Sequence, residues 1–155
     1  MTWASTCPAA IAGLLAALGR SPALSGVTIT DGMGITDPDA TEVVSIGFSG
    51  SPDDESAADA QVTREGAGLR NREQYRISCA LAVTSGDAGA GALAAVRQRA
   101  FDLLGAAGDA ISADPTLGRA VLGARVSSWS LSPAQSGNGV RAAIQFSVSI
   151  DAFTR

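Results

Sequence analysis

The amino-acid sequence predicts an α+β fold, with a mixed, mainly antiparallel sheet of about five strands and two helices packed on one of its faces. Three observations lead to this prediction. The chain has 155 residues, which is enough for one domain, residues 1–155, with its own core. Hydrophobic residues make up 46% of the chain and charged residues 17%, as in a folded protein. The apolar periodicities follow the order α-β-β-β-α-β-β, in which strands joined by short connections dominate.

The N-terminal third predicts a short helix and two strands. The helix begins at Cys7-Pro8, because proline is tolerated in the first turn, and its apolar residues recur every three or four positions over residues 11–18. This apolar run has no basic residue before it and is too short to cross a membrane, so we expect neither a signal peptide nor a membrane anchor. Residues 27–30 alternate as a strand, Asp31-Gly32 turns the chain, and residues 42–48 form the next strand.

Residues 49–71 show no regular periodicity, and we expect a long flexible loop there. A loop of this length inside one domain is either functional or disordered. Its first part is acidic and arginines follow, a polarity that suits head-to-tail contact between identical subunits, although a solvated surface loop is the alternative. The candidate interface residues are Asp53, Asp54, Glu55, Asp59, Arg64, Arg70 and Arg72.

The second half predicts one more strand, the main helix and a hairpin. Residues 73–84 alternate, and Cys79 falls on the apolar face, where we expect a buried free thiol. The main helix covers residues 91–113, and Gly105 and Gly108 within it indicate close packing against the sheet. Strands at 126–131 and 140–152 flank a glycine-rich turn. The last strand alternates strictly and would be a sheet edge that needs a cover or a partner.

The composition excludes several kinds of chemistry. The chain has no histidine, which is the usual general base near neutral pH and the commonest transition-metal ligand. It also has no lysine, since all 11 basic residues are arginine, so Schiff-base chemistry is absent. Two cysteines alone cannot hold a metal cluster. We therefore expect no catalytic residues, no cofactor and no metal site, and we do not expect an enzyme.

The net charge of −4 argues against a protein that grips nucleic acid, because that function needs a basic stripe. Acidity still permits a passage whose walls repel phosphate.

Taken in this order, the elements resemble the tail terminator (tail completion) proteins of long-tailed bacteriophages, the siphoviruses. The likeness covers nearly the whole chain, and 114–118 is its most distinctive piece. The segments that carry it are 27–32 (VTITDG), 43–47 (VVSIG), 73–83 (EQYRISCALAV), a helix with Arg97, Arg99, Phe101, Leu103 and Leu104, 114–118 (DPTLG), and the end VSIDAFTR.

The resemblance implies a structural virion protein that caps the finished tail tube as a hexameric ring. Its partners would be the tail tube protein, a head-tail connector protein and further copies of itself, and the candidate interface residues would contact the tube or the adjacent subunit. DNA would pass through the lumen without sequence-specific binding. The protein would be made in the host cytoplasm and would reside at the head-tail junction of the virion. Two alternatives stay open: another head-tail connector, such as a head-completion or stopper protein, and an unrelated α+β binding module or carboxylate-based enzyme.

Overall fold

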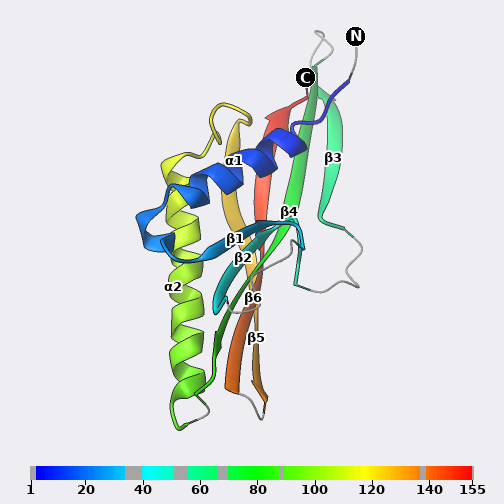
Figure 1. Ribbon diagram of the computed structural model, residues 1–155. Helices are drawn as coiled ribbons and strands as arrows, with labels where there is room; N and C mark the ends of the chain where they lie inside the picture. The colour runs from blue at the N-terminus through cyan, green and yellow to red at the C-terminus, as the bar shows by residue number, and fades with distance from the viewer. Residues whose placement is uncertain are drawn as a thin grey trace.

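The computed structural model describes residues 3–33, 40–50, 56–65, 70–87, 89–136 and 139–154, with side chains omitted at 133–136. These residues form two α-helices, one short 3₁₀ helix and a six-stranded sheet, which confirms the predicted α+β class (Figure 1). In chain order the elements are α1 (Cys7–Gly19), η1 (Pro22–Leu24), β1 (Thr28–Asp31), β2 (Glu42–Ile46), β3 (Ala58–Glu65), β4 (Arg70–Ser85), α2 (Ala92–Ala113), β5 (Gly123–Ser136) and β6 (Gly139–Phe153).

Strands β4 and β6 form the centre of the sheet. They pair antiparallel from Arg72 opposite Phe153 to Ser85 opposite Val140. The strand order is β1-β2-β4-β6-β5, and β3 pairs with β4 off this path. Two strands share the second side of β4, since β2 pairs with residues 79–83 and β3 with residues 70–77. Apart from β1 and β2, which are parallel, all neighbours are antiparallel.

Strand β3 corrects the expectation of a loop over residues 49–71. Eight of those residues, Ala58–Glu65, are a strand, and β4 begins at Arg70. The sequence of β3 is small or polar on both faces, and Val62 is its one large apolar residue. It therefore lacks the alternation that predicts a half-buried strand. Residues 58–65 are a strand because their backbone pairs with the long N-terminal half of β4.

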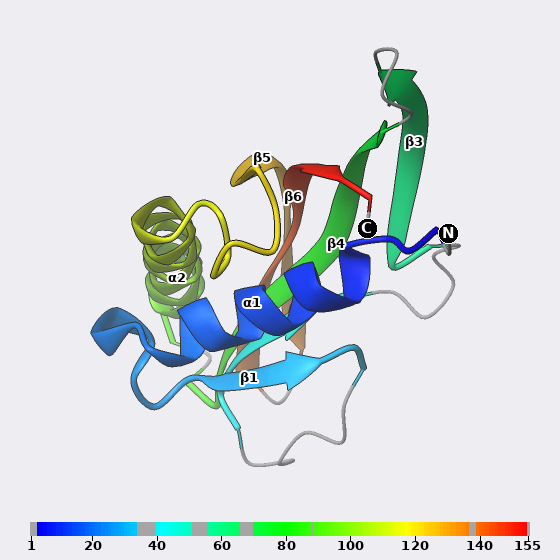
Figure 2. The ribbon, with the colours of Figure 1, turned by 90° about the horizontal axis from the view of Figure 1, so that it is seen from above.

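Both helices lie on one face of the sheet, as expected. Helix α2 runs along the strands and α1 crosses them, and the view from above shows both on the same side (Figures 1 and 2). We call the helix-covered side the inner face and the opposite side the outer face. The core lies between the helices and the inner face. Its largest fully buried side chains include Leu14 and Leu18 of α1, Leu103 and Ile111 of α2, and Ile46, Ile77, Leu81 and Ile144 of the sheet.

Two further expectations are wrong. The final strand is not an edge, because β6 lies between β4 and β5, and the two ends of the strand order are β1 and β5. Pro133 lies in β5, and proline is tolerated on an edge strand such as this one, which has a strand partner on one side only among the described residues. The glycines Gly105 and Gly108 of α2 do not mark close packing, since a Cβ at either position would have no heavy atom within 4 Å apart from its chain neighbours and the backbone of α2 itself. Within the described ranges, neither α1 nor α2 has the length and apolar character needed to cross a membrane.

Candidate interaction surfaces

The first candidate surface is a two-stranded arm, formed by β3 and by residues 70–77 of β4. Every residue of β3 after Ala58 is exposed. In both views β3 lies on the side of the sheet away from α2 (Figures 1 and 2). One side of β3 pairs with β4, and the other side has no strand partner among the described residues. The arm therefore presents an open row of backbone groups.

The register divides the predicted interface residues between the two faces of this arm. In the strand register Asp59 lies opposite Arg76 on the outer face, and the alternation of side chains places Arg70 and Arg72 on the same face. Arg64 pairs with Asn71 and lies on the inner face. Asp53, Asp54 and Glu55 lie outside the described residues.

Arg70 and Arg72 hold the arm to the end of β6. Arg72 donates from Nε to Asp151 Oδ1 at 2.8 Å and from Nη2 to Asp151 Oδ2, and it reaches Glu65 Oε1 at 3.2 Å. These hydrogen bonds lower the pKa of Asp151 below its ordinary value and raise that of Arg72. The Arg70 guanidinium carbon lies 4.4 Å from the centroid of the Phe153 ring. Both arginines thus have partners within their own chain, whereas Asp59 and Arg64 form no ion pair among the described residues.

Glu73 fixes the middle of the arm to the N-terminus of α1. Its side chain is buried, with an exposed fraction of 1%. Glu73 Oε1 accepts the Thr6 backbone N–H and hydroxyl, both at 2.6 Å, and Oε2 accepts the Ser5 hydroxyl at 3.0 Å. Since the Thr6 hydroxyl has one proton, the Tyr75 hydroxyl donates to Thr6 Oγ1 at 2.9 Å. A carboxylate from the sheet thereby caps the first turn of the helix.

Sequence reasoning missed this role of Glu73, although a signal was present. Glu73 is two residues before Tyr75, and so it continues the apolar face of the strand. A charge at a core-facing position indicates a buried partner.

The second candidate surface is the edge formed by β5. This strand pairs with β6 on one side and has no described strand partner on the other. A bulge between Val126 and Ser128 interrupts the regular pairing. Leu122, just before the strand, and Trp129 within it have exposed fractions of 52% and 56%. Trp129 meets Phe101 of α2 edge to face, with ring centroids 5.0 Å apart. Large apolar side chains at an open edge are typical of a surface that a partner covers.

The outer face is hollowed between these two surfaces. A depression of about 550 Å³ extends from Asp59 of β3 across Arg76 and Ser149 to Arg125 of β5. Five arginines and three carboxylates of described residues lie on this face, namely Arg70, Arg72, Arg76, Arg125, Arg141, Asp59, Glu65 and Asp151. The face is therefore mixed in charge, with an excess of arginine.

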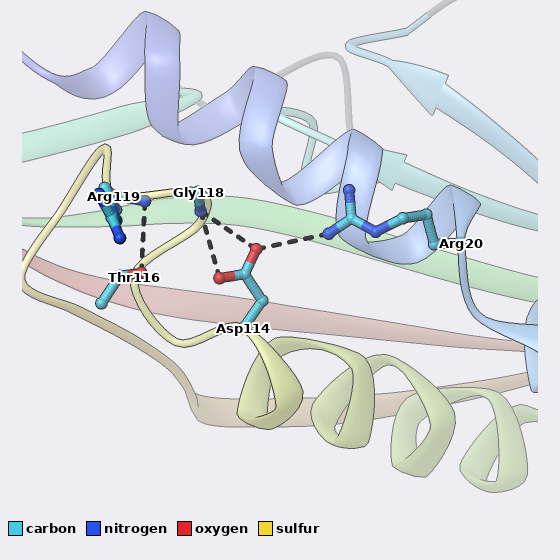
Figure 3. A network of polar contacts seen from close by, with 5 residues as sticks. All are labelled: Arg20, Asp114, Thr116, Gly118 and Arg119. Carbon is cyan, nitrogen blue, oxygen red and sulfur yellow. Dashed lines mark hydrogen bonds and ion pairs between the residues drawn. The ribbon is translucent and has the colours of Figure 1, made fainter.

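The segment 114–118 forms a tight turn at the end of α2 (Figure 3). The Asp114 carboxylate accepts the Gly118 N–H at 3.1 and 3.2 Å and contacts Arg20 at 3.4 Å. Leu117 is buried at φ 50°, and Gly118 follows at φ 69°. A Cβ placed on Gly13 of α1 would lie 2.7 Å from Leu117 Cβ, so the turn packs directly on that helix. The described contacts of residues 114–118 join the end of α2 to α1.

Both cysteines are free thiols, and Cys79 is buried, as predicted. Burial raises the pKa of Cys79 to about 12, so its thiol stays protonated at neutral pH. Burial likewise raises the pKa of the half-buried Cys7 thiol, and the nearby Glu73 carboxylate adds to the effect.

Comparison with protein-family models and with curated proteins found no match to this chain.

Proposed function

We propose that this protein is a structural, ring-forming protein of a long-tailed bacteriophage that caps the completed tail tube at the head-tail junction. The observation that carries the proposal is the open sheet. Within the described residues three strands have an unpaired side, β1, β3 and β5, and two of them carry a large exposed apolar side chain, Val62 on β3 and Trp129 on β5. A contact that joins two different edges, one from each subunit, is head to tail, and such contacts close into a ring when the rotation allows it.

The order of elements supports the same proposal. It matches the order on which the resemblance to tail terminators depends, with β3 as one added strand. The composition fits a structural role, because histidine and lysine are both missing from the chain. In this proposal the ring binds the tail tube on one side and a head-tail connector on the other, and DNA passes through its lumen.

The oligomeric state tests the ring. Light scattering coupled to size exclusion, with negative-stain images, should show a closed ring of several copies, and adding polymerised tail tubes should place that ring at the tube end. Binding to a portal ring instead of tubes would support the connector alternative. A chain that stays monomeric at every concentration and ignores both structures contradicts the proposal.

The acidic segment provides a second test with matched variants. Changing Asp53, Asp54 and Glu55 to serine keeps the chain length and should abolish tail capping without unfolding the protein. The control changes Asp102 and Asp109, which are exposed on α2, to serine and should cap normally. Normal tail length and infectivity from the first variant would remove the segment from the interface.

A further inference from the structure

Strands β3 and β5, two of the three strands with an unpaired side among the described residues, are complementary to each other in direction. Strand β3 is antiparallel to β4, β4 to β6, and β6 to β5, so β3 and β5 run in opposite directions. A neighbouring copy that is related by rotation about an axis along the strands keeps its strand directions. Its β3 then meets β5 of the first copy as an antiparallel pair, the kind of pairing that already dominates this sheet.

The edges also match in level. The register sets Asp59, Arg76, Ser149 and Arg125 in one row across the sheet, on the outer face. A second row on the inner face contains Val62, Glu73 and Ala152, and Leu122 is next to it, since Gly123 pairs with Asp151. Residues 58–62 of β3 therefore lie level with residues 126–122 of β5.

The side chains at these levels are complementary. Across the junction, Asp59 of one copy would face Arg125 of the next, and neither has an ion-pair partner among the described residues. Val62 would face Leu122, with exposed fractions of 46% and 52%. Ala60 would face Ala124, two small residues that let the backbones approach. No like charges meet in this register, and the bulge after Val126 ends the regular stretch where β3 begins.

We propose that β3 of one copy adds to the open edge of β5 in a second copy, antiparallel and with Asp59 opposite Arg125. This contact makes the sheet continuous from subunit to subunit. The inference rests on the proposed self-association and names the surfaces that carry it.

A charge-exchange experiment on the full chain tests this register. Asp59→Arg or Arg125→Asp alone sets like charges against each other and should raise the concentration needed for half-assembly by about tenfold. The double variant restores opposite charges and should return the assembly to within about threefold of the parent. Both positions are exposed, so each variant should keep the parent's far-UV circular dichroism spectrum. The matched controls Asp109→Arg and Arg97→Asp alter exposed charges of α2 and should assemble like the parent.

Sedimentation velocity gives the readout, and its outcomes are distinct. Single variants that assemble like the parent overturn the β3–β5 contact but do not contradict the proposed ring-forming function. A double variant that assembles no better than the single variants has the same meaning. A parent that never assembles overturns the proposed function and this contact together. As an independent check, a variant with Asp59→Cys and Arg125→Cys should form a disulfide-linked ladder under mild oxidation, because facing Cβ atoms of antiparallel strands lie about 5 Å apart. Each single cysteine variant should give no product beyond a dimer.

Discussion

At the scale of single residues, the carboxylate of Glu73 joins two parts of the chain that are 67 or more positions apart. It accepts three hydrogen bonds from Ser5 and Thr6 and holds the start of α1 against β4. Burying a carboxylate costs free energy unless hydrogen-bond donors surround it, and Ser5 and Thr6 supply these donors. Glu73 lies in the middle of the arm, opposite Val62, so it ties the inner face of the arm to the helix layer.

Replacing Glu73 with alanine should therefore destabilise the domain by about 3 kcal/mol, because the buried Thr6 N–H and hydroxyl lose their charged acceptor. Urea unfolding followed by circular dichroism measures the loss. The control is Glu65→Ala on the same arm, which removes a half-exposed ion pair with Arg72 and should cost far less, because exposed ion pairs contribute little to stability. Equal free energies of unfolding for the two variants would mean that the Glu73 network contributes nothing beyond a surface pair.

At the scale of elements, the turn after α2 sets how the two helices meet. Asp114 ties the turn to itself and to Arg20, and the turn buries Leu117 against α1. Leu117 and Arg119 adopt positive φ values of 50° and 69°, which are uncommon for residues other than glycine. The packing of the turn on α1 and the hydrogen bonds from Asp114 and Thr116 thus hold a backbone conformation that residues other than glycine disfavour.

Gly13→Ala tests this contact. The new Cβ would lie 2.7 Å from Leu117 Cβ and 3.0 Å from its carbonyl oxygen, so α1 or the turn must shift, and we expect a loss of about 2 kcal/mol in unfolding free energy. Gly108→Ala is the matched control, since the added Cβ there would meet no heavy atom within 4 Å apart from its chain neighbours and the backbone of α2. The control should gain about 1 kcal/mol from the higher helix propensity of alanine. A neutral Gly13→Ala variant would show that the helices tolerate separation at the turn.

At the scale of the whole molecule, the sequence predicts those elements whose periodicity comes from the core. Strands β4 and β6 and helix α2 have long apolar stripes, and their positions and buried faces follow from those stripes. Strand β3 contributes almost nothing to the core, so only its pairing with β4 reveals it. For the candidate interface, too, the sequence predicts one part and the structure is needed for the other. Opposite charges locate the region, but the register is needed to place Asp59 on one face and Arg64 on the other.

The charge of the whole molecule leads to the last prediction, which concerns DNA. A protein that binds duplex DNA non-specifically does so with Kd values of about 10⁻⁴ to 10⁻⁶ M at physiological salt, and it neutralises phosphates with clustered cations. This chain has a net charge of −4, and Arg20, Arg72 and Arg99 are paired with carboxylates. The arginines of the outer face share it with Asp59, Glu65 and Asp151. A ring that lets DNA slide through should bind duplex DNA more weakly than such proteins do, because tight contacts would hold the DNA in the lumen.

Fluorescence anisotropy of a labelled duplex should therefore show half-saturation only above about 100 µM protein at physiological salt, with less than a tenfold change between low and high salt. The variant Asp53→Arg, Asp54→Arg and Glu55→Arg makes the net charge positive and serves as the positive control. It should bind the duplex measurably, and its affinity should fall steeply with salt, because each released counterion contributes to the slope. Micromolar, salt-sensitive binding by the parent chain would instead identify the arginines of the outer face as phosphate ligands and would replace free passage of DNA with a grip on it.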